Sequence, residues 1–337
     1  MMLKRKFSAL VAAALMTPLA SFAYLQHGEA GAEVFSFMGT FDGPRNIALE
    51  KSAGASPSTD PSVTQINPAA IRMADGKKHV VSMHWQTGDL TENEGSAFFT
   101  GKNGIFIYQL SYNWIDEGSI AGYDEWGNET GVDYEPFSQM VTATLSFPLK
   151  HFSFGTTIKF VSDRLAEEEG DRAALGAAFD WGILWQSASK IVGLSLVAKD
   201  FGYMIRDYVD EGTDEFYTMS QTFSISGYLR PKSVRRLTIF AASDFPRYAD
   251  AVLDLGAEYA LGTNFAIRAG FTRTWIDLTR DFKELAASND RPSEANESRM
   301  LSAGLGYNNS LFTVDYAISY LTQGMGFEHR VGLSVGF

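Results

Sequence analysis

The sequence predicts an all-β protein that folds as a transmembrane, antiparallel, up-and-down β-barrel of about 14 strands. Three observations predict this fold. Apolar residues recur at every second position over most of the chain after His79. Tight turns alternate with longer loops between the expected strands. The chain ends on an amphipathic strand whose last residue, Phe337, is aromatic.

Residues 1–23 are expected to be a cleaved signal peptide. Lys4, Arg5 and Lys6 form a cationic start, the next 14 residues are apolar, and Ser21 and Ala23 supply small residues at the cleavage site. The apolar run is shorter than the ~20 residues that a membrane-spanning helix needs. The mean hydropathy of −0.10 would suggest a soluble protein, but a barrel strand is apolar on one face only.

The composition excludes some classes of function. The formal net charge is −12 and becomes more negative once the signal peptide is removed, so we expect no binding to nucleic acid. The chain has no cysteine, which fits an exported protein that does not depend on disulfides.

Residues 24–78 do not alternate as membrane strands do. They contain Gly43-Pro44, a stretch rich in Ser, Pro and Gly at 52–61, and Asn67-Pro68. Such a segment either extends into the periplasm or folds back into the lumen of the barrel that residues 79–337 form.

Each expected strand has one apolar face. In residues 152–160, Phe154 and Ile158 share one face, while Ser153 and Thr157 share the other. A soluble β-sandwich, the alternative fold, would cover its second face with large charged residues. Here Gly, Ser, Ala and Thr dominate that face, which suits a crowded or watery lumen. The expected strands are 79–88, 94–101, 104–116, 136–148, 151–163, 172–187, 190–200, 216–229, 234–245, 252–261, 264–276, 299–308, 310–321 and 326–337.

The connections give the orientation. Short turns such as Leu149-Lys150 and Gly262-Thr263 alternate with longer loops such as 117–135 and 277–298. Bacterial barrels have short periplasmic turns, long extracellular loops and an even number of strands. We therefore expect both termini in the periplasm and the protein in the outer membrane of a Gram-negative bacterium. One misread hairpin would change the strand count to 12 or 16.

No set of residues points to catalysis. The five histidines have no metal-like spacing, and no Ser, His and acidic group stands out as a catalytic set. We expect no enzyme activity, no cofactor and no metal centre. Acidic residues crowd three long loops, around 116–135, 167–171 and 207–215. These loops either bind a divalent cation or a partner, or are simply kept solvated by their charge.

Inward-facing charges leave two alternatives open. Lys159, Asp180, Arg268 and Asp315 are expected on the lumenal face. They either line a conduit or pair across the lumen and hold it closed.

The chain resembles the PorV/PorQ family of outer-membrane proteins. Asn67-Pro68-Ala69 matches the family's N-P-A motif before the first strand, although Ala70 replaces the family glycine and residues 47–54 replace its glycine-rich opening. Further similar stretches follow in the family's order, at 154–160, 174–184, 192–202, 255–259, 266–271, 301–307 and 314–317.

The resemblance implies a barrel like the fatty-acid channel FadL, with an N-terminal segment that plugs the lumen. It places Asn67, Pro68 and Ala69 in that plug, where the fixed φ of a proline suits a rigid kink. Several family members serve type IX secretion, in which they bind secreted cargo proteins that carry a C-terminal signal domain.

The leading functional hypothesis is therefore a PorV/PorQ-type barrel that binds secreted cargo or type IX secretion components. The alternatives are a FadL-like channel for small hydrophobic molecules and a structural barrel. A continuous apolar pocket with a lateral gap in the wall would favour the channel. A lumen filled by residues 40–75, with exposed apolar loops, would favour protein binding. Further expected partners are outer-membrane lipid and the barrel-assembly machinery, for which Phe337 is the expected signal.

Overall fold

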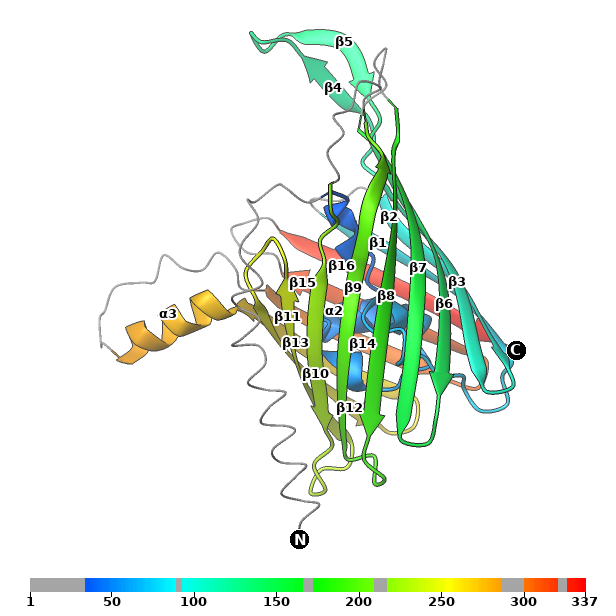
Figure 1. Ribbon diagram of the computed structural model, residues 1–337. Coiled ribbons are helices and arrows are strands. Elements are labelled where there is room, and N and C mark those ends of the chain that lie inside the picture. The colour runs from blue at the N-terminus through cyan, green and yellow to red at the C-terminus, as the bar shows by residue number, and fades with distance from the viewer. Residues whose placement is uncertain (1–33, 89–92, 166–171, 209–216, 287–299, 321–325) are drawn as a thin grey trace.

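The computed structural model describes residues 34–88, 93–165, 172–208, 217–286, 300–320 and 326–337; the expected signal peptide lies outside them. The fold is a closed antiparallel barrel of 14 strands, as predicted (Figure 1). Each strand pairs with its neighbours along the chain, and the last strand closes on the first, for example with Val80 opposite Gly336. The barrel strands are β1 (His79–Gly88), β2 (Asn93–Asn103), β3 (Phe106–Asp116), β6 (Phe137–Pro148), β7 (Phe152–Arg164), β8 (Ala174–Gln186), β9 (Val192–Arg206), β10 (Thr222–Leu229), β11 (Leu237–Pro246), β12 (Val252–Leu261), β13 (Phe265–Thr274), β14 (Met300–Asn308), β15 (Phe312–Tyr320) and β16 (Phe327–Gly336).

The alternation of residue types places apolar side chains outside and small or polar ones inside. On β7, Phe154 and Ile158 are exposed on the outer wall, while Ser153 and Thr157 are buried in the lumen. Inward hydroxyls pair across neighbouring strands; Thr144 Oγ1 and Thr157 Oγ1, for example, lie 2.7 Å apart. No helix among the described residues is long and apolar enough to span a membrane.

Two long connections contain elements that the periodicity did not predict. Between β3 and β6, strands β4 (Ile120–Tyr123) and β5 (Glu129–Tyr134) form a separate hairpin beyond the barrel wall (Figure 1). After β13, the chain continues as helix α3 (Trp275–Ala286). Strands β4 and β5 are too short for a period to be read, and the helical spacing of apolar residues in α3 covers only 275–282, where the expected strand 264–276 meets the expected loop 277–298.

Strand β9 extends past the predicted end at residue 200 because the chain bulges there. The pairing of β8 with β9 shifts register between Phe179 and Trp181. Asp200 adopts a left-handed φ of 62°. A bulge adds one residue to one strand, so Lys199 and Asp200 both place their charged groups in the lumen.

Residues 34–78, called here the lumenal segment, lie against the inner wall (Figure 1). The segment carries four short helices: η1 (Ser36–Gly39), α2 (Pro44–Ala48), η2 (Ser52–Ala55) and η3 (Pro61–Gln65). Proline begins α2 and η3, where its missing N–H costs nothing. Asp60 caps η3 by accepting a hydrogen bond from the Ser62 amide at 3.0 Å.

Glycines of the wall make room for this segment. A Cβ added at Gly155 would lie 2.2 Å from the Pro68 carbonyl carbon. A Cβ at Gly182 would lie 2.2 Å from Asn67 Oδ1, and one at Gly304 would lie 2.4 Å from the Ala48 Cβ. The small residues on the inner face therefore serve close packing of backbone against backbone.

Candidate functional site

A cavity of about 1120 Å³ lies in the barrel above the lumenal segment. Its lining includes Gly88 and Glu94 at the loop ends of β1 and β2, and Glu328 near the start of β16. These positions are at the end of the barrel opposite Phe337. Since the short turns are periplasmic, this end is extracellular. We call the cavity the vestibule.

One side of the vestibule is apolar. Phe35, Phe37, Met38 and Phe41 line it from the lumenal segment, together with Ile115 of β3. The Phe37 ring stacks edge-on between the other two, with centroids 6.2 Å from Phe35 and 5.9 Å from Phe41. Behind them lies a buried apolar cluster that continues into the wall through Met140, Val161, Ala174, Ala178 and Met219.

The rest of the vestibule is charged, with an excess of acidic groups. Eight carboxylates and four cations line it. The carboxylates belong to Asp42, Glu50, Glu94, Glu117, Asp200, Asp244, Asp254 and Glu328, and the cations to Lys51, Lys159, Lys199 and Arg330.

Arg330 of β16 fixes residues 40–42 of the vestibule lining, called here the floor. Its Nη1 donates hydrogen bonds to the carbonyl oxygens of Thr40 and Asp42, at 2.8 and 2.5 Å. The same nitrogen lies 3.5 Å from Glu94 Oε1, so the guanidinium is also paired with a buried carboxylate. The wall therefore holds residues 40–42 in place through a single side chain.

Lys51 holds the same loop from within the lumenal segment. Its Nζ donates to the Gly39 carbonyl at 2.7 Å and pairs with Asp42 Oδ2 at 2.8 Å. Burial alone would raise the pKa of Asp42, but Lys51 and then Arg330 hold that pKa below its ordinary value. At Glu50, burial outweighs the groups that stabilise the carboxylate. The pKa of Glu50 is therefore raised, even though the Ser302 hydroxyl donates a hydrogen bond to this carboxylate.

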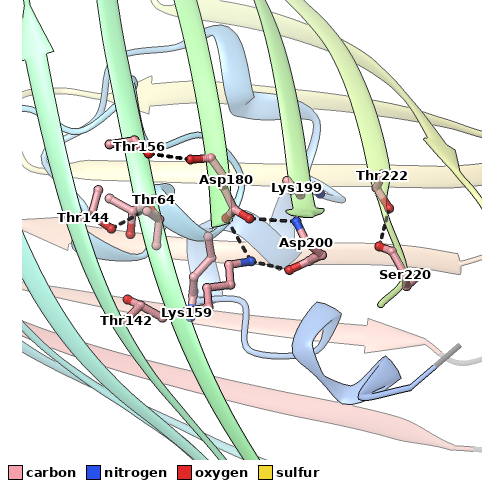
Figure 2. Close-up of polar contacts among 12 residues, drawn as sticks. Thr64, Thr142, Thr144, Thr156, Lys159, Asp180, Lys199, Asp200, Ser220 and Thr222 are labelled. Carbon is pink, nitrogen blue, oxygen red and sulfur yellow. Dashed lines mark hydrogen bonds and ion pairs between the residues drawn. The ribbon is translucent and has the colours of Figure 1, made fainter. Parts of the chain in front are cut away.

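The inward charges that sequence singled out are paired. Figure 2 shows Lys159 between two carboxylates, with Nζ 2.9 Å from Asp180 Oδ2 and 2.6 Å from Asp200 Oδ1. The bulge brings Asp200 into this cluster, and its amide donates to Asp180 Oδ1 at 2.8 Å. These groups pair along the wall and not across the lumen, and Lys159 also lines the vestibule, so neither alternative is decided.

A second ionic chain joins the lumenal segment to the opposite wall. Arg268 Nη1 lies 2.5 Å from Asp315 Oδ1, and Arg268 Nε lies 2.7 Å from Glu258 Oε2. Arg45 of α2 shares Glu258, with its Nε 3.0 Å from the same oxygen. The lumenal segment is thus tied to β12 and β13 as well as to β16.

The residues predicted from sequence lie outside the vestibule. Asn67 is fully buried beside β8, where its Nδ2 donates to the Gly54 carbonyl at 2.7 Å and its Oδ1 accepts from the Ala69 amide at 2.9 Å. Pro68 packs against Gly155. Phe337 follows β16, its ring exposed and 5.7 Å from that of His79. Their roles as plug motif and assembly signal stay predictions.

Of the vestibule lining, sequence reasoning singled out Lys159 but missed the phenylalanines and Arg330. The signal was the run Phe35-Ser36-Phe37-Met38-Gly39-Thr40-Phe41, three phenylalanines in seven residues of a segment without strand periodicity. Arg330 belongs to the final strand, and its partner carbonyls lie 288 and 290 residues earlier in the chain.

The acidic loop of residues 116–135 uses one of its carboxylates locally. Asp124 Oδ1 accepts from the amides of Trp126 and Asn128, at 3.0 and 2.8 Å, and these bonds lower its pKa. Within the described residues, no group of three or more His, Asp or Glu side chains could hold a metal ion. Parts of the other two acidic loops lie outside the described residues.

Comparisons with protein-family models and with curated proteins find no match. Solved structures do match. The toluene transporter TodX of P. putida gives a TM-score of 0.60 at 12% identity, covering 88% of this chain and 99% of that one. The Ralstonia pickettii toluene transporter TbuX gives 0.58 at 11% identity, covering 88% and 97%.

At such low identity the likeness establishes the fold. The chain is an outer-membrane β-barrel of a Gram-negative bacterium. The finer resemblance to the PorV/PorQ family stays a prediction.

Proposed function

We propose that the protein is an outer-membrane channel for small molecules that have an apolar body and no negative charge. The observation that carries this proposal is the vestibule, which faces the cell exterior and has an apolar side on the lumenal segment, where Phe37 packs between the buried Phe35 and Phe41. Small-molecule sites are concave cavities of about this size that bind the apolar body of a ligand on an apolar surface. The toluene transporters with the same fold suggest the same class of ligand.

The acidic excess supports the restriction on charge. A solute anion about 7 Å from one unpaired carboxylate is repelled by ~2 kcal/mol at an effective dielectric constant of 20. Neutral solutes are not repelled, and cationic solutes are attracted by the same carboxylates.

Passage requires the lumenal segment to move, because residues 35–42, 47, 50–51 and 65–66 of this segment line the vestibule and residues 40–42 form one loop of that lining. Arg330 and Lys51 are the side chains that hold this loop, so we propose that its displacement opens the route. The proposal assigns the protein no catalytic, cofactor or metal-dependent role.

The test is uptake by liposomes that contain the purified full-length barrel. Toluene, benzylamine and benzoate share one ring and differ in charge. We expect toluene and benzylamine to enter faster than in protein-free liposomes, and benzoate not to. Faster uptake of benzoate, or no acceleration of any of the three, would refute the proposal.

A second candidate, binding of secreted cargo or type IX secretion components, is favoured by a different observation. The β4–β5 hairpin exposes Trp126, Tyr123 and Val132 beyond the barrel, with the indole of Trp126 78% exposed. Exposed aromatic side chains on a loop suit a protein interface. Affinity capture from gently solubilised outer membranes tests it. Secreted proteins that share a C-terminal domain should be recovered, and recovery of lipid alone would argue against this role.

A further inference from the structure

Helix α3 leaves the barrel from its outer face. Its first residue, Trp275, donates from Nε1 to Ser243 Oγ at 2.7 Å. Ser243 belongs to the outward row of β11, on the same face as the exposed Ile239, while the buried Phe240 and Ala242 face the lumen. The indole therefore lies on the lipid side of the wall. Figure 1 shows the rest of α3 projecting sideways, away from the vestibule mouth.

The polar residues of α3 gather on one side of the helix. Arg273, at the end of β13, is buried and pairs with Asp281 at 2.8 Å and with Asp277 at 3.6 Å. Asp277 also pairs with Arg280. Since residues three and four apart share a helix face, these ion pairs fix one polar face.

The other face is apolar. Trp275, Leu278 and Phe282 follow the i, i+3, i+7 spacing of a single helical stripe. Phe282 is 63% exposed, and Trp275 is 38% exposed. Exposure of this stripe to water would be unfavourable, because moving a phenyl group from water to an apolar environment lowers the free energy.

The outer wall next to the strand that leads into α3 carries a continuous band of large side chains. Phe271 is paired with Leu301, Leu301 with Tyr320, and Tyr320 with Phe327, across four neighbouring strands. The rings of Tyr320 and Phe327 lie 5.3 Å apart. Aromatic residues in this position mark the boundary between hydrocarbon and headgroups. Helix α3 begins four residues beyond Phe271, so the chain leaves the wall for α3 at the level of this band.

We propose that α3 is an interfacial helix that lies in the outer leaflet, with its apolar stripe among the lipid chains, its Asp277 and Asp281 against Arg273 of the wall, and Arg280 toward water. The occupant of the stripe is membrane lipid. Helices of this kind lie in the plane of the interface with their apolar face buried below the headgroups. The inference does not depend on the proposed function.

The absence of cysteine from the chain allows a direct test. Single variants Phe282→Cys and Leu278→Cys place a nitroxide spin label on the stripe, and Arg280→Cys places one on the polar face. Phe160→Cys on the outer wall and Trp126→Cys on the β4–β5 hairpin are references for lipid and for water. The full-length barrel is reconstituted in phosphatidylcholine vesicles, and heat-modifiable migration confirms that each variant is folded.

The measurement is the collision rate of each label with oxygen, which concentrates in lipid, relative to a water-soluble nickel chelate. We expect this ratio to be several-fold higher for Phe282→Cys and Leu278→Cys than for Arg280→Cys, matching Phe160→Cys. A ratio like that of Trp126→Cys would overturn the proposal. So would dipolar broadening, which indicates a second copy, or low collision rates with both reagents, which indicate protein cover.

Discussion

The clamp formed by Arg330 leads to a quantitative prediction. Replacing it in Arg330→Met removes both hydrogen bonds to the carbonyls of Thr40 and Asp42 and leaves Glu94 without its cation. Methionine fills much of the same volume without donors. A hydrogen bond from a charged group contributes about 1.5–3 kcal/mol. We use the lower value, because water reaches the carbonyls once the loop moves, and obtain about 3 kcal/mol for the two.

That free energy corresponds to a ~10²-fold larger population of the displaced loop. Hydrogen exchange of the amides of residues 39–42, followed by mass spectrometry in lipid, measures this population. We expect exchange there to accelerate by that factor while the barrel amides stay protected. Toluene uptake should rise in parallel.

Arg280→Met is the matched control, since it removes an arginine on α3, outside the lumen. It should leave exchange of residues 39–42 unchanged. Unchanged exchange in Arg330→Met would refute the argument that Arg330 holds the floor. Global loss of protection in that variant would show that Arg330 serves the barrel as a whole.

Three further predictions follow from the lumenal packing and the vestibule. Gly155→Val should displace the turn at Pro68 and lower the thermal unfolding temperature, because overpacking costs about 1–3 kcal/mol. The control Gly39→Ala should not lower this temperature, since no atom lies within 4 Å of the added carbon. Glu50→Gln should stabilise the protein at neutral pH. Folding raises the Glu50 pKa, so ionisable Glu50 destabilises the folded protein. This destabilisation is absent below the ordinary pKa of 4.5 and grows as pH rises through the pKa in the folded protein. A gain in stability at pH 3 equal to that at neutral pH would therefore contradict the assignment. Phe37→Ala should weaken toluene binding by about 1 kcal/mol, measured by equilibrium dialysis of the solubilised barrel, whereas Phe160→Ala on the outer wall should have no effect.

Much of the fold could be predicted because it depends on local pattern. Alternation of Phe154 and Ile158 with Ser153 and Thr157 specifies which face meets lipid, and the turn lengths specify which end is periplasmic. The extension of β9 could not be predicted, because two consecutive charged residues, Lys199 and Asp200, are typical of the end of a strand. Here a bulge turns both side chains into the lumen, and the strand continues.

The site was harder to predict because it is assembled from distant parts of the chain. Arg330 contacts carbonyls almost 290 residues away, and no periodicity records such a contact. The phenylalanines at 35, 37 and 41 belong to a segment whose path inside the barrel is determined by tertiary contacts, such as the fit of Pro68 against Gly155. Sequence therefore indicated a crowded lumen but not the cavity above it.

Localising a bound solute tests the central claim most directly. A structure of the wild-type barrel with 4-bromotoluene, in which bromine is found by its anomalous scattering, shows where an apolar aromatic molecule sits. We predict a bromine peak in the vestibule, against the Phe37 ring. Bromine found only on the outer wall, with the vestibule empty at saturating solute, would contradict the account.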